Sequence, residues 1–151
     1  MSMIEVGELL YEVTFKITGL TEYGVSFDEL IAGKVAPPRE GARFDVTFEG
    51  TANGPKLKGT AVGVDYIRVR ADGRFGLHIH ESITTDDGQN IDAQGDGVAL
   101  LRTGSSIADL RINMTLFTSS KSYTWVNTLQ VWGIGTVDLA QQIIQVTAYS
   151  A

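Results

Sequence analysis

The stretch from Gly41 to Gly88, GARFDVTFEGTANGPKLKGTAVGVDYIRVRADGRFGLHIHESITTDDG, decides the fold. Its apolar and polar residues alternate with a period of two, which is typical of strands with one buried face. Turn-forming residues interrupt the alternation at 53–55 (Asn-Gly-Pro), 71–73 (Ala-Asp-Gly) and 86–88 (Asp-Asp-Gly). The stretch therefore predicts consecutive antiparallel strands joined by tight turns.

The same alternation continues on both sides of this stretch. It predicts eight strands, at residues 8–17, 42–49, 56–70, 74–85, 90–101, 109–117, 123–134 and 142–149. Unpaired strand edges are an aggregation hazard that closure removes, and eight strands close around packed side chains or one small ligand. We therefore expect an all-β fold, a closed antiparallel eight-stranded barrel. A two-sheet sandwich is the main alternative, because it produces the same alternation.

Residues 20–40 break the period of two. Gly19 is expected to end the first strand, and Ser26 can cap a short helical turn with Glu29 as its capping-box partner. The turn would stop at Gly33. The segment thus predicts a short helix near one mouth of the barrel, acting either as a lid over a site or as a plug.

Composition narrows the class of protein. The length of 151 residues fits one domain over 1–151, and the net charge of -6 with scattered basic residues argues against nucleic acid as a partner. The absence of cysteine excludes disulfides and thiolate sites. No apolar run approaches the roughly 20 residues of a membrane helix, and residues 1–10 lack signal-peptide features. We expect a cytoplasmic protein with no membrane partner.

Several short motifs resemble a family of small bacterial and fungal proteins known only as a domain of unknown function. The likeness covers most of the chain beyond residue 40. It implies a closed antiparallel barrel similar to calycins and allene oxide cyclases, and it implies no established activity. In the family, the strand before Thr-Asp-Asp-Gly often reads Leu-Asp-x-Arg, whereas here the polar positions hold His78 and His80. The motifs are Gly41-x-Arg43, Gly50, Gly54-Pro55-x-Leu57-x-Gly59, Gly63-x-Asp65-Tyr66, Asp72-Gly73, Thr85-Asp86-Asp87-Gly88 and Tyr123-x-Trp125-Val126-Asn127.

His78 and His80 are the most distinctive candidates for chemistry. They are the only histidines, and residues two apart on a strand share a face. The pair suits two ligands of one divalent metal, with a carboxylate from Asp65, Asp92 or Glu12 as the third. A second hypothesis makes both rings metal-free acid–base groups. A third places them on the solvated outer face or packs them beside Arg and Tyr. We adopt the second, with no metal and no cofactor.

Asp65 is the third predicted catalytic residue. Aspartate is disfavoured in strands, so a residue between Val64 and Tyr66 is either a bulge residue or an inward-facing site residue. The resemblance favours the site. The residues expected to bind the ligand are Arg43, Tyr66, Tyr123, Trp125 and Asn127.

These residues support a first hypothesis and two alternatives. The first is a cofactor-independent isomerase, cyclase, lyase or hydrolase that acts on a small, largely apolar metabolite in the barrel lumen. The second is a lipocalin-like protein that only binds a hydrophobic ligand. The third is an interaction module with a filled barrel. A homodimer or larger homo-oligomer is a further expectation, which no particular residue supports.

Overall fold

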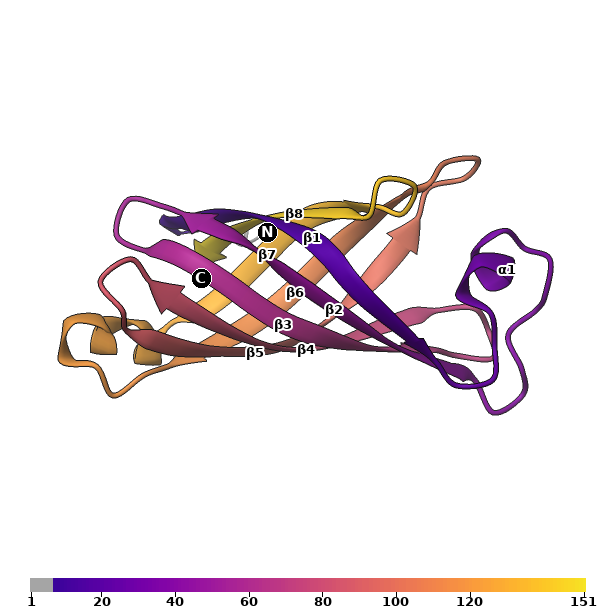
Figure 1. Ribbon diagram of the computed structural model, residues 1–151, viewed down its shortest axis with the longest axis horizontal. Coiled ribbons are helices and arrows are strands. Elements are labelled where there is room, and N and C mark those ends of the chain that lie inside the picture. Colours follow the sequence, from indigo (N-terminus) through magenta and orange to yellow (C-terminus); the bar gives the residue numbers. More distant parts are fainter. Residues whose placement is uncertain (1–6) are drawn as a thin grey trace, which may run out of the picture.

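The computed structural model describes residues 7–151 and shows eight long strands wrapped into a barrel (Figure 1). Residues 1–6, which belong to the segment 1–10 expected to lack signal-peptide features, lie outside the described residues. No helix within residues 7–151 is long and apolar enough to cross a membrane. The strands are β1 (Leu9–Glu22), β2 (Ala42–Asn53), β3 (Lys58–Val69), β4 (Phe75–Thr85), β5 (Asn90–Leu101), β6 (Ile107–Phe117), β7 (Gln130–Asp138) and β8 (Ile143–Ser150).

The strands form one closed antiparallel barrel in which each strand pairs with the next along the chain. β1 also pairs with β8, with Val13 opposite Val146 and Phe15 opposite Ile144, so the sheet has no free edge. The predicted closed eight-stranded barrel is confirmed, and the sandwich alternative is wrong.

Alternation along each strand separates a lumen from an outer wall. In β4 the inward residues are Phe75, Leu77, Ile79, Glu81 and Ile83, and the residues between them face outward. Apolar inward side chains of all eight strands form the main core cluster. The lumen is not filled, because several inner-face positions carry little or no side chain. These positions are Gly63, Ala93, Gly95, Gly97, Ala99, Gly133 and Gly135.

A short helix, α1 (Phe27–Ile31), lies at one mouth, as predicted (Figure 1). The side chain of Ser26 accepts a hydrogen bond from the Glu29 backbone N–H at 3.3 Å. The ring of Phe27 packs edge-on against Phe44 of β2, with centroids 4.9 Å apart. Together with the core residue Leu30, this contact anchors α1 on the rim of the barrel.

The opposite end of the barrel carries a 3₁₀ helix, η1 (Lys121–Thr128), where a strand was predicted over 123–134. Asn127 explains the difference, because its side chain accepts the backbone N–H of Thr118 and donates to the Thr118 carbonyl, both at 2.9 Å. These bonds fold the segment back on the end of β6, and Val126 is fully buried there. Only residues 130–138 continue as β7.

The first strand is also longer than predicted. Gly19 does not end it, because β1 continues to Glu22 through a register shift between Ile17 and Gly19 against β2. Such an irregularity lets a strand bend without leaving the sheet. The extension leads β1 toward the end of the barrel that carries α1 (Figure 1).

Candidate functional site

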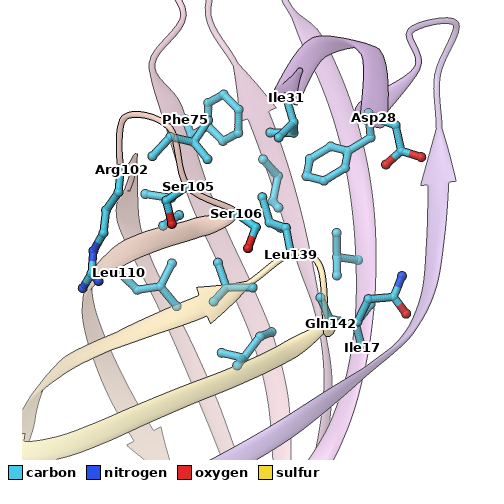
Figure 2. A pocket seen from close by; sticks show the side chains of 18 of the residues that line it. Ile17, Asp28, Ile31, Phe75, Arg102, Ser105, Ser106, Leu110, Leu139 and Gln142 are labelled. Carbon is cyan, nitrogen blue, oxygen red and sulfur yellow. The ribbon is translucent and has the colours of Figure 1, made fainter. Parts of the chain in front are cut away.

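The lumen contains a cavity of about 730 Å³, which we call the outer chamber, at the end of the barrel that carries α1. This volume is in the range of small-molecule sites. Figure 2 shows Ile31 of α1, Phe75 of β4 and Leu139 around it, with Ser105 and Ser106 from the β5–β6 loop. The lining is mainly apolar, so the chamber suits a ligand with an apolar body.

A smaller space of about 50 Å³, the inner chamber, lies deeper in the lumen. Its polar lining residues are Tyr11 of β1, Asp65 of β3 and Glu81 of β4. Asp65 also lines the outer chamber, as do Leu77, Leu110 and Ile144, so the two chambers meet at this level. The inner end of a ligand in the outer chamber would therefore lie next to the ionisable groups of the inner chamber.

Asp65 occupies the junction of the two chambers. Its side chain is half-buried, and one carboxyl oxygen accepts the backbone N–H of His78 at 3.0 Å. In the β3–β4 ladder Asp65 pairs with Ile79, and pairing resumes at Arg68 with Gly76. His78 lies between these two pairs, where its backbone N–H donates to the Asp65 carboxylate. Burial raises the pKa of Asp65 to about 6, although the hydrogen bond and charge of His78 oppose the shift.

Glu81 is the second lumenal carboxyl group and is buried, with 7% of its surface exposed. Burial alone raises its pKa to about 7, and no hydrogen bond or charge from residues 7–151 contributes to the shift. The buried Tyr11 lies nearby. Its pKa is raised by burial and then by the charge of Glu81. A carboxyl group held near neutral pH in an apolar space is typical of proton-transfer sites.

His78 and His80 do not reach the lumen, and their predicted position there is wrong. The apolar series that includes Leu77 and Ile79 faces inward, so the period of two turns both imidazoles to the outer wall. The side chain of His78 is 56% exposed. The exposure removes the reason for assigning them acid–base work on a lumenal ligand.

On the outer wall, the two imidazoles form a hydrogen-bonded chain with Asp96 of β5. The Nδ1 atom of His78 lies 2.8 Å from the Asp96 carboxylate, and the Nε2 atoms of the two rings are 3.2 Å apart. Tyr66 packs against both rings. Within the described residues 7–151, no group of three or more His, Cys, Asp or Glu side chains is arranged to hold a metal ion.

The five predicted ligand-binding residues are also absent from the lining of both chambers. Arg43 and Tyr66 lie with the histidines on the outer wall, where Arg43 pairs with Asp45 at 3.2 Å. Tyr123, Trp125 and Asn127 belong to η1 at the far end of the barrel. Tyr123 donates a hydrogen bond to Asp87 at 2.8 Å, and Asn127 bonds the backbone of Thr118.

Two lumenal residues, Glu81 and Tyr11, were missing from the predicted site. Both lie on the inward face that the alternation itself assigns. The available signal was a charged residue, Glu81, within the otherwise apolar series of β4 that runs from Phe75 to Ile83. Buried polar groups among apolar neighbours are often functional.

Solved structures of other proteins are similar to this chain in fold. A protein of unknown function from Clostridium acetobutylicum is 18% identical, with 95% of this chain and 96% of that chain covered and a TM-score of 0.76. A beta-barrel like protein from Acinetobacter baumannii is 22% identical, with 95% and 94% covered and a TM-score of 0.71. An enzyme from Penicillium herquei is 20% identical, with 99% and 98% covered and a TM-score of 0.61. At these identities the likeness shows the fold.

No curated protein matches the sequence significantly. The sequence profile of a protein family of unknown function, DUF3237, matches residues 22–151. The match extends from the end of β1 to the last residue and includes both lumenal carboxyl groups. The chain belongs to the DUF3237 family.

Proposed function

We propose that the barrel is a cofactor-independent enzyme that moves a proton on a small, largely apolar metabolite bound in the outer chamber. Asp65 is the general base. One observation carries the proposal: the Asp65 carboxyl group stands at the inner end of an apolar cavity of about 730 Å³, where burial raises its pKa to about 6. At neutral pH such a group is mostly ionised and still basic enough to accept a proton.

The proposal fits several reaction types. Proton removal from carbon or from a hydroxyl group starts isomerisation, ring closure and elimination alike. The similar barrel from Penicillium herquei is described as an enzyme, which is consistent with catalysis in this fold but does not transfer a reaction to this chain.

The test uses 5-nitrobenzisoxazole, an apolar probe of carboxylate bases. A base removes the proton on C3, the C–H electrons form the nitrile, and the N–O bond breaks to release a coloured cyanonitrophenolate. We expect ring opening above the rate of free acetate, with an inflection near pH 6. Asp65→Asn should lower the rate at least tenfold, whereas Asp92→Asn on the outer face of β5 should not. Equal rates for wild type and Asp65→Asn would contradict the proposal.

A hydrophobic-ligand carrier is the second candidate function. The size and apolar lining of the outer chamber favour it as much as they favour an enzyme. A carrier would bind an apolar fluorescent dye in the lumen with equal affinity in wild type and Asp65→Asn, and it would show no ring opening. Binding together with Asp65-dependent turnover supports the enzyme.

A further inference from the structure

The ionisable side chains that line the lumen are mostly acidic. Three acidic residues line its chambers, namely Asp28 at the rim, Asp65 at the junction and Glu81 in the inner chamber. The only basic lining residue within 7–151 is Arg102, at the outer chamber. Its guanidinium is held by Asp109 through bonds of 2.8 and 3.2 Å. The deep part of the lumen therefore has two acids and no cation.

The two deep carboxyl groups come from neighbouring strands. In the β3–β4 register, Asp65 is opposite Ile79, and Glu81 is opposite Gly63, two residues along the same inner face. Diagonal neighbours of this kind have Cα atoms about 7–8 Å apart. A Cβ at Gly63 would lie 2.7 Å from the Cβ of Glu81, so the glycine leaves the room that Glu81 needs. The register thus brings both carboxyl groups to the passage between the chambers.

Glu81 is buried among mainly apolar residues of the inner chamber, and burial is the cause of its raised pKa. No salt bridge within the described residues 7–151 involves its carboxyl group. Its carboxyl group borders the inner chamber, whose volume of about 50 Å³ is enough for a small polar head group. Buried carboxylates are normally paired or hydrogen-bonded. An ammonium group on a ligand would supply both a charge and three N–H donors.

We propose that the lumen selects ligands with a protonated amine at the end of an apolar body, and that Glu81 holds the amine in the inner chamber, which leaves the Asp65 carboxylate at the junction to act as the base. The apolar body fills the outer chamber, and ligands with a carboxylate head group are rejected. This inference rests on the proposed function, since it names the substrate class of the same site. The groups that face the amine are Asp65 from β3, Glu81 from β4 and Tyr11 from β1; the other strands lining the inner chamber contribute apolar residues or glycine.

The test compares octylamine, octan-1-ol and octanoate by isothermal titration calorimetry of the full chain at pH 8 and pH 5. At pH 8 we expect octylamine to bind at least tenfold more tightly than octanol, and octanoate to bind most weakly. At pH 5 both carboxyl groups become neutral, so the advantage of the amine over the alcohol should fall at least tenfold.

Substitutions test whether Glu81 binds the amine. Glu81→Gln should weaken octylamine about tenfold at pH 8 and change octanol less than twofold, whereas Glu12→Gln on the outer face of β1 should change neither. If Glu81→Gln does not fold, the pH comparison on the wild type still decides. Octanoate or octanol binding as tightly as octylamine at pH 8 would overturn the inference alone. Failure of all three ligands and of an apolar dye to bind would overturn the proposed function with it.

Discussion

The Asp65 carboxylate accepts the backbone N–H of His78 across the barrel wall, at 3.0 Å. The side chain of Asp65 lies in the lumen, whereas the side chain of His78 lies on the outer surface. The bond gives a fixed orientation to the proposed base. It also brings the charge of His78 close enough to lower the pKa of Asp65, against the larger effect of burial.

Removal of the His78 side chain should therefore alter the acidity of the lumen without abolishing the site. His78→Ala keeps the backbone N–H and loses the imidazole, so the pKa of Asp65 should rise. The inflection of ring opening would move to higher pH by the same amount. Ser82→Ala, on the same outer face of β4, is the control. Complete loss of turnover in His78→Ala would contradict this prediction and show that His78 is needed for catalysis.

Glu81 should make the protein less stable as the pH rises. Its folded-state pKa is about 7 and its ordinary value is 4.5, so unfolding favours its ionisation between those values. Its contribution to stability is complete below pH 4.5 and is lost as the pH rises through 7. Glu81→Gln does not ionise, so its free energy of unfolding should gain roughly 3 kcal/mol relative to wild type between pH 4 and pH 8. Urea denaturation measures this difference, and Glu12→Gln is the control. A constant difference across this range would show that Glu81 is not buried as described.

The alternation of the sequence predicts the strands and places Glu81 in the apolar series of β4. Closure into a barrel follows from the need to remove free strand edges, and only the family resemblance favours an inward Asp65 over a bulge residue. Alternation does not show which of two faces holds a ligand, and histidines at 78 and 80 suggest chemistry on either. The small inward residues of β5 and β7, such as Gly97 and Gly133, create the cavity only once the barrel closes around them.

Local sequence patterns do not predict the 3₁₀ helix η1. Tyr123 and Trp125 have strong strand preference, but the bonds between Asn127 and Thr118 depend on a contact across nine residues. That tertiary contact overrides the local preference. It also turns three predicted ligand residues into a structural cap at the end opposite the site.

Asn127 should accordingly contribute to the stability of the fold and not to ligand binding. Asn127→Ala removes two hydrogen bonds to Thr118, and we expect a loss of about 1–2 kcal/mol in the free energy of unfolding. Dye binding in the lumen should stay within twofold of wild type. Ser122→Ala, an exposed position in η1, serves as the control. A large loss of dye binding in a folded Asn127→Ala protein would place the residue at the ligand site after all.

Gly63 should tolerate no side chain. A Cβ there would lie 2.6 Å from the His80 carbonyl oxygen and 2.9 Å from the Cα of Glu81, so β3 and β4 would have to separate. Gly63→Ala should cost about 1–3 kcal/mol, measured as a lower urea midpoint. Gly76→Ala is the matched control, because its Cβ would meet nothing closer than 3.8 Å. Equal stability of the two variants would mean that the strands are not this close.

Filling the outer chamber should block ligands without unfolding the barrel. Ala99 of β5 lines this chamber, and its neighbour Val98 points to the outer wall. Ala99→Phe places a ring in space that is empty of protein, so packing should keep the urea midpoint at or above the wild-type value. Dye binding and ring opening should both fall at least tenfold. Val98→Phe adds an aromatic ring at the adjacent position on the other face and should leave both unchanged. If Ala99→Phe binds dye and turns over the probe like wild type, the reaction takes place outside this chamber, and the outer wall around His78 becomes the place to look.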